Sequence, residues 1–155
     1  MSDRDLIRHT VATVAYRGGK TIRDAPPGFA GFPGAGKPPA QILAHLGDLF
    51  DWALRMAKGD TTWSDSAPLA WEQEKARFFS AIAAFDAYLA SEEPIQAPLE
   101  KLFQGPIADA LTHVGQLAML RRLAGCPMKG ENYFVAQVEA GRVGPEQIKA
   151  AREFD

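Results

Sequence analysis

The fold class of this 155-residue chain is decided by the stretch Pro106-Ile-Ala-Asp-Ala-Leu-Thr-His-Val-Gly-Gln-Leu-Ala-Met-Leu-Arg-Arg-Leu-Ala-Gly125. Its apolar residues recur at helical spacing. It opens on proline and closes on glycine, which is the usual asymmetry between the start and the end of a helix. Arg121 and Arg122 fall in its last turn, where cations interact favourably with the helix dipole. We therefore predict a helix over residues 106–125.

Three further segments of the chain show helical periodicity. They cover residues 3–22, 39–58 and 68–91, and the second of them opens on Pro39 and is followed by Gly59. No segment shows a convincing strand alternation. The chain is also long enough to bury a sizeable core. We therefore predict an all-α fold, a four-helix bundle formed by a single domain over residues 1–155.

The connection after the first helix is long and rich in proline and glycine. It spans residues 23–38 and contains Phe29 and Phe32, which a linker that only had to span a distance would not need. Long loops in compact domains are often functional. We interpret this connection as an ordered crossover or as a cover over a site.

The remaining connections carry weaker patterns. Pro94 and Pro98 predict an irregular segment, and residues 133–139 predict a short amphipathic turn or helix. Pro145 is expected to open a short C-terminal helix over residues 146–153.

Composition and charge exclude several classes of protein. The net charge of -2 gives no electrostatic reason to expect nucleic acid as a partner. The polar N-terminus is not followed by an apolar segment of the secretory type, and no stretch is apolar for long enough to span a bilayer. The single cysteine, Cys126, excludes an internal disulfide. We expect a cytoplasmic protein with no membrane partner.

Two histidines and one aspartate form the most informative pattern for function. Asp109 and His113 lie four residues apart, so they share one face of the predicted helix. His45 flanks the apolar stripe of the helix predicted over residues 39–58. If these two helices pack together, the three side chains meet and leave a fourth position open, which suits a catalytic divalent metal. The donor set fits zinc, nickel, iron and manganese alike.

A structural interpretation of the same residues stays open. Partly buried histidines that are hydrogen-bonded to neighbouring groups are common, and a carboxylate such as Asp109 is favoured in the first turn of any helix. Gln116, one turn beyond His113, can line the same pocket or lie on the surface. His9 lies on the first predicted helix and is not counted as a ligand.

Other chemically suggestive residues favour structural roles. Trp52, Trp63 and Trp71 are expected to pack rather than to form a substrate cage, because an indole buries a large apolar area. Cys126 follows a helix C-terminus, which does not lower the pKa of a thiol. The glycine-rich residues 28–36 lack the Lys-Ser/Thr ending of a phosphate-binding loop.

The chain resembles the DinB/YfiT-like superfamily, four-helix bundles that hold a divalent metal with three histidines. The resemblance extends roughly from the first helix to Gly125. It rests on Ile42-Leu-Ala-His45-Leu-Gly-Asp-Leu-Phe-Asp-Trp52 and on His113-Val-Gly-Gln-Leu117. His45 and His113 match the family's metal ligands, whereas Asp109 stands where the family commonly has its third histidine. The resemblance also implies a homodimer.

Two functions of different classes follow from this resemblance. The first is a metal-dependent S-transferase or isomerase that uses a low-molecular-weight thiol and an electrophilic small molecule, with Arg121 or Arg122 as a candidate to hold an anionic substrate. The second is a non-catalytic helical bundle that acts through dimerisation or partner binding and keeps a degenerate metal site. Non-haem iron oxygenases also use two histidines and a carboxylate, but on β-sandwich folds, so they rank third.

Overall fold

The computed structural model describes residues 1–34 and 36–155, and this part of the chain is mostly helical, as predicted. Its long helices are α1 (Asp3–Ile22), α2 (Pro39–Ala57), α3 (Trp71–Ala90) and α5 (Ala108–Leu123). Its short elements are η1 (Phe29–Gly31), α4 (Leu99–Leu102), the π-helical turn η2 (Phe103–Ile107), β1 (Gly130–Glu131), η3 (Tyr133–Val135) and β2 (Glu153–Phe154). The first two predicted helices match α1 and α2 closely, and the third starts at Trp71 rather than at residue 68.

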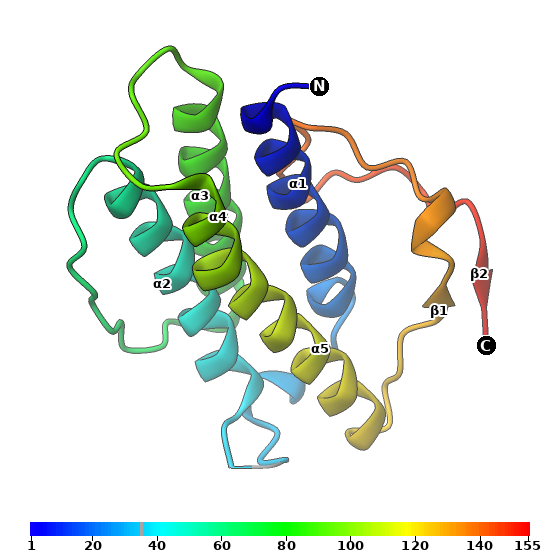
Figure 1. Ribbon diagram of the computed structural model, residues 1–155. Coiled ribbons are helices and arrows are strands. Elements are labelled where there is room, and N and C mark those ends of the chain that lie inside the picture. Colours follow the sequence, from blue (N-terminus) through cyan, green and yellow to red (C-terminus); the bar gives the residue numbers. More distant parts are fainter. Residues whose placement is uncertain (35) are drawn as a thin grey trace.

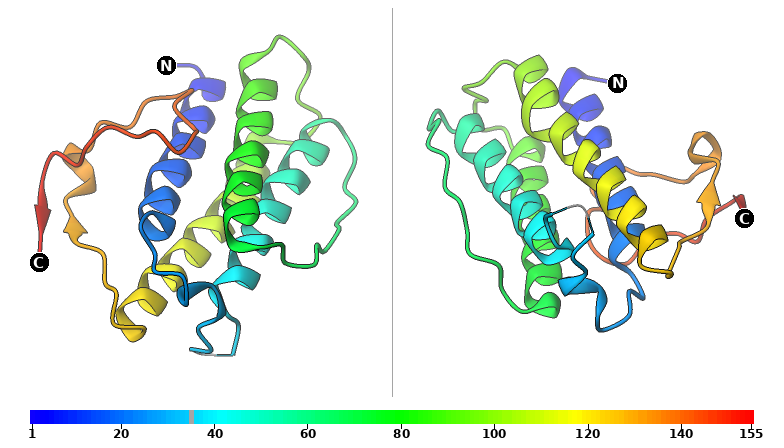
Figure 2. Two further views of the ribbon diagram at one scale, coloured as in Figure 1. Left: turned by 180° about the vertical axis from the view of Figure 1, so that it is seen from behind. Right: turned by 90° about the horizontal axis from the view of Figure 1, so that it is seen from below.

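The long helices share one apolar core. Helix α1 contacts α3 and α5, and α2 contacts the same two helices (Figures 1 and 2). Four phenylalanines are almost completely buried among them, namely Phe29, Phe50, Phe78 and Phe85. Each such side chain contributes roughly 1.5–3 kcal/mol through burial. The crossover after α1 is therefore ordered at Phe29, whose ring also meets the edge of Trp71 with the centroids 5.9 Å apart.

The helix that carries Asp109 and His113 begins earlier than the sequence indicates. Residues after Pro98 were predicted to be irregular, and this is wrong, because α4, η2 and α5 follow one another without a break. Pro106 lies inside the π-helical turn. A proline removes one backbone donor and its ring clashes with the preceding turn of an α-helix, and a locally widened turn relieves that clash. Leu102, fully buried, anchors the added turn in the core.

The C-terminal residues do not form the short helix predicted over residues 146–153. They run in an extended path to β2, which pairs with β1 in antiparallel register, Glu153 opposite Glu131. The predicted segment is too short to be a stable helix on its own. Tertiary contacts decide its path instead, since Val143 is buried in the core. The segment predicted over residues 133–139 forms only the single turn η3.

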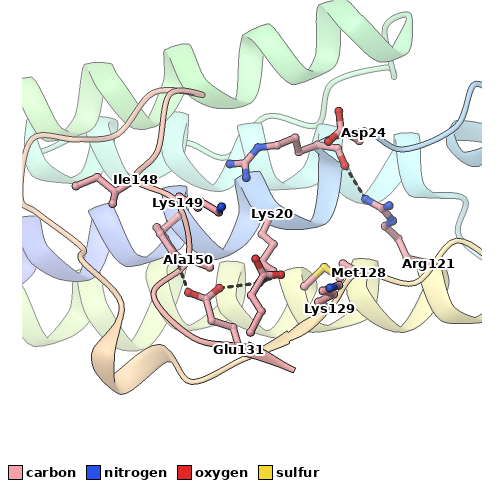
Figure 3. A pocket seen from close by; sticks show the side chains of 12 residues that line it. Lys20, Asp24, Arg121, Met128, Lys129, Glu131, Ile148, Lys149 and Ala150 are labelled. Atoms are coloured by element: carbon pink, nitrogen blue, oxygen red, sulfur yellow. Dashed lines mark hydrogen bonds and ion pairs between the residues drawn. The ribbon is translucent and has the colours of Figure 1, made fainter. Parts of the chain in front are cut away.

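A buried carboxylate attaches this C-terminal segment to α1. The Glu131 side chain is fully buried, accepts a hydrogen bond from the Tyr16 hydroxyl, and lies 2.7 Å from Lys20 Nζ. Lys20 and Glu131 line a cavity of about 260 Å³ between α1 and the C-terminal segment (Figure 3). Because the carboxylate has both a hydroxyl and an ammonium partner, its burial does not leave an unpaired charge.

A second ionic cluster joins α2 to α3. Arg77 donates from Nη2 to Asp48 Oδ1 at 2.5 Å, and from Nη1 to Glu74 Oε1 at 3.1 Å and to the Ala44 carbonyl at 3.0 Å. Asp48 is 5% exposed and Glu74 is completely buried. Gly47 makes room for this arrangement, because a Cβ there would lie 2.7 Å from Arg77 Nη1.

We predict that Arg77→Leu lowers the free energy of unfolding by about 3 kcal/mol, because it leaves two buried carboxylates without their cation. Urea denaturation at neutral pH measures this change. Arg122→Leu is the control, since Arg122 is exposed at the end of α5, and its effect should stay within about 0.5 kcal/mol. Equal effects of the two substitutions would contradict the assigned role of Arg77.

We predict that Tyr16→Phe destabilises the protein by about 1–3 kcal/mol, because Glu131 loses a buried donor. Burial and then the hydrogen bond to Glu131 raise the pKa of Tyr16. Because the pKa of Tyr16 is higher in the folded than in the unfolded state, the protonated hydroxyl stabilises the folded state fully at any pH below its ordinary pKa of about 10. This stabilisation is lost as the pH rises above 10 toward the pKa in the folded state. Urea denaturation of the wild type and of Tyr16→Phe at several pH values on both sides of 10 should show a difference in the free energy of unfolding that is constant below pH 10 and shrinks above it.

Tyr133→Phe is the matched control for this substitution. The Tyr133 hydroxyl has no side-chain partner among residues 1–34 and 36–155, whereas its ring meets Tyr16 edge-on at 6.3 Å. Tyr133→Phe keeps the ring and should leave both the stability and its pH dependence near those of the wild type. A loss as large as that of Tyr16→Phe would mean that the hydroxyl bond to Glu131 is not what matters.

Candidate metal centre

Helices α2 and α5 bring together the three side chains that the sequence singled out. His45 projects from α2 beside the buried residues Leu46 and Leu49. Asp109 and His113 lie one turn apart on α5, as the four-residue spacing requires. Because α2 packs against α5, the imidazole from one helix faces the carboxylate and the imidazole of the other. One potential ligand atom from each of the three residues lies within 4.8 Å of the others.

The distances within this cluster are compatible with shared coordination of a metal ion and also with long hydrogen bonds. Asp109 Oδ2 lies 3.4 Å from His45 Nε2 and 3.4 Å from His113 Nε2. Hydrogen bonds from nitrogen to oxygen are usually shorter, about 2.7–3.2 Å. Two ligand atoms at about 2.0–2.1 Å from a tetrahedral metal ion are about 3.3 Å apart. The donor types and the spacing therefore fit a divalent ion.

The cluster is open to solvent on one side. The side chains of His45, Asp109 and His113 are 33%, 46% and 18% exposed. The two imidazole rings meet nearly edge to face, with centroids 4.6 Å apart and planes at 81°. A structural metal site is normally closed by four protein ligands, whereas three ligands with access to solvent leave a position for a further molecule.

Gln116 orients the ring of His113. Its Oε1 lies 2.7 Å from His113 Nδ1, on the side of the ring away from Asp109. In the tautomer that carries its proton on Nδ1, His113 donates a hydrogen bond to Gln116 Oε1, and the unprotonated Nε2 faces the cluster. Such outer contacts fix the tautomer of metal-binding histidines. The sequence had left Gln116 open between a pocket residue and a surface residue.

A cavity of about 200 Å³ adjoins the cluster. It is lined by both histidines and by residues of α2 and of the connection between α2 and α3, including Asp48, Asp65 and Ser66. Asp48 Oδ2 accepts a hydrogen bond from the Ser66 backbone, and Glu74 Oε2 accepts one from the Leu69 backbone. The Arg77 cluster therefore also holds the wall of this cavity in place.

Trp52 and Trp71 pack against the core, as expected, and the Trp63 ring lies between Trp52 and His45. The Trp63 ring lies 5.5 Å from the His45 ring and 5.6 Å from the Trp52 ring, between centroids. Trp71 packs against Phe29, away from the cluster. The seven-residue spacing from His45 to Trp52 placed Trp52 on the same side of the helix. Trp63 lies in a connection without periodicity, so no sequence pattern indicated its position.

The remaining sequence candidates lie outside the cluster. His9 is on α1 and belongs to no group of potential ligands among the described residues. Arg121 is 6% exposed and donates to the backbone oxygens of Thr21, Arg23 and Cys126, so it closes the end of α1 and is not available to a substrate. Arg122 is exposed, and Cys126 is half-buried with a free thiol.

Comparison of the chain with protein-family models, with curated proteins and with solved structures finds no match. Among the described residues, no helix combines the length and the apolar character that crossing a membrane requires.

We predict that Gln116→Leu weakens divalent-metal binding by roughly tenfold or more, because His113 loses the partner that fixes its tautomer. Calorimetric titration of the metal-free protein with zinc measures the affinity. Gln116→Glu keeps an acceptor at the same place and should retain most of the affinity. Equal affinities for wild type and Gln116→Leu would show that the contact does not orient the ligand.

Proposed function

We propose that this protein binds a divalent metal through His45, Asp109 and His113, and that it is a four-helix bundle of the DinB-like type. The observation that carries the proposal is the convergence of these three side chains from two helices, with one carboxylate oxygen 3.4 Å from both Nε2 atoms. The pairwise contacts of α1, α2, α3 and α5 support the bundle. The motifs around His45 and His113 support the family.

Asp109 makes the centre chemically different from one with three histidines. A divalent ion together with one carboxylate and two neutral imidazoles forms a site with a net formal charge of about +1. When bound, such an ion acts as a Lewis acid and lowers the pKa of a thiol or water molecule that it contacts. The carboxylate weakens that effect relative to a third imidazole. Zinc, nickel, iron and manganese all accept this set of ligands.

The activity that we infer is the transfer of a low-molecular-weight thiol to an electrophilic small molecule, or a related isomerisation. In the transfer, the S–H bond breaks and the sulfur forms a bond to the electrophilic carbon. The bond from that carbon to its leaving group breaks, the leaving group departs with the electron pair, and the thiol proton goes to solvent or to the leaving group. The side chains around the cluster position its ligands: Gln116 contacts the His113 ring, and Trp63 packs against the His45 ring. We propose that the protein works in the cytoplasm as a homodimer.

A second function is favoured by one property of the cluster. Asp109 can accept from both imidazoles when they are protonated, so the three side chains can satisfy one another without a metal. A non-catalytic bundle that binds partners or dimerises would keep such a polar group as a remnant of a metal site.

Elemental mass spectrometry of protein purified without added metal or a histidine tag distinguishes the two functions. The metal-centre proposal predicts about one divalent ion per chain, lost in His45→Ala and His113→Ala and diminished in Asp109→Ala. His9→Ala is the control and should keep its metal. Asp109→His, which restores the donor type common in the family, should bind metal at least as well as the wild type.

The interaction-protein alternative predicts a different outcome. No metal would be found, even after reconstitution with zinc, nickel, iron and manganese, and the three alanine substitutions would leave the fold unchanged. That result would overturn the metal centre and with it the thiol-transfer activity. If metal binds, thiols and electrophiles can be screened with His113→Ala, which is expected to lose the metal, as the inactive reference.

A further inference from the structure

A mainly apolar groove of about 560 Å³ runs along α5 and starts at the candidate metal centre. Three of its residues, Gly115, Met119 and Leu123, are spaced by four, so they form one stripe along the helix. Met119 is 48% exposed and Leu123 is 59% exposed. Ile42 and Leu120, both buried, contribute apolar side chains beneath them. His113 lines both this groove and the cavity beside the cluster.

Gly115 gives the groove its depth. It lies in the middle of α5, where a glycine is less favourable than an alanine by about 1 kcal/mol. No neighbour requires the absence of a side chain, because a Cβ built there meets no described atom within 4 Å. The helix therefore gives up stability at this position without any gain in packing within the chain. Space left open in this way is what a bound molecule would occupy.

The length of the groove suits an extended molecule. His113 and Leu123 are ten residues apart on one helix, which corresponds to roughly 15 Å along its axis. The apolar residues occupy the far part of this span, and the polar side chains of Thr112, His113 and Gln116 lie at the near end. A molecule that followed the groove would have a polar head beside the metal centre and an apolar body directed toward Leu123.

The charge at the near end favours an anionic head. Lys37 lines both the groove and the cavity beside the cluster, and no acidic residue lines the groove. The two carboxylates of the adjoining cavity already have partners, since Asp48 pairs with Arg77 and Asp65 accepts from the Trp63 indole. The third carboxylate nearby, that of Asp109, is directed at the two histidines, with its Oδ2 3.4 Å from both Nε2 atoms. An anion at the near end of the groove gains Lys37 as its cation.

We infer that the groove binds a small carboxylate with an extended alkyl body, its carboxylate at Lys37 and its alkyl chain along Met119 and Leu123. Describing this molecule as the substrate rests on the proposed metal centre, whereas its binding does not. A groove that shares Lys37, Ile42 and His113 with the cavity beside the cluster suits a narrow small molecule better than the face of a second chain.

Isothermal titration of the full-length protein with octanoate tests the inference. One saturable site per chain is expected, and butyrate should bind roughly a hundredfold more weakly because it buries fewer methylene groups. Lys37→Gln should weaken octanoate binding about tenfold and leave octanol binding unchanged, because only the former has a charged head.

Gly115→Leu is the decisive variant, because it fills the groove at an exposed helical position where leucine is favourable. Octanoate binding should be lost while the bound metal, measured on the same sample, stays as in the wild type. Ala83→Leu, an equivalent change at an exposed position of α3, is the control and should bind octanoate normally. A wild type that binds octanoate but takes up no divalent metal would overturn the metal centre alone, whereas metal loss with retained octanoate binding in His45→Ala would support both sites.

Two outcomes would overturn the groove as a carboxylate site. The first is the absence of saturable octanoate binding, or binding that Gly115→Leu leaves unchanged. The second is a dimer, detected by sedimentation, that Gly115→Leu disrupts while the wild type does not bind octanoate. The groove would then be a contact surface between two copies of the chain.

Discussion

Two carboxylates are buried where α2 packs against α3, and both depend on one cation, Arg77. Asp48 and Glu74 would each be unfavourable in the core without a positive partner, and Arg77 reaches both because Gly47 leaves room for its guanidinium. The other oxygens of the two carboxylates accept backbone hydrogens from Ser66 and Leu69. One ionic cluster thus fixes the packing of two helices and the path of the connection that forms a wall of the site.

This arrangement explains why an exposed connection can hold a defined position beside the candidate metal centre. Residues 61–70 are all exposed and contain no regular element, yet Trp63 packs on His45 and Trp52. The fixed ends near Ser66 and Leu69 reduce the conformations open to the connection, so a modest aromatic contact is sufficient to place the indole. The ionic cluster of Arg77, Asp48 and Glu74 therefore holds the connection beside the candidate metal centre as well as the packing of α2 against α3.

In the C-terminal segment, too, a buried carboxylate with its partners decides the path of the chain. Residues that favour a helix by composition follow an extended path, because Glu131 is held by Tyr16 and Lys20 and β2 pairs with β1. Local preference for a helix is weak over so few residues, and a buried charge pair with strand pairing outweighs it. The segment covers one side of α1 (Figure 2) and leaves the end of α5 that carries Met119 and Leu123 exposed.

The sequence by itself determined the long helices and the pairing of Asp109 with His113, because a period of 3.6 residues fixes both locally. From the sequence alone, the approach of His45 to Asp109 and His113 was only a hypothesis, because the distance between two helices depends on how their apolar faces pack. Tertiary structure alone decided the position of Trp63, the π-helical turn at Pro106 and the buried role of Arg121. Each depends on contacts between residues distant in the chain, and no spacing along the sequence records such contacts.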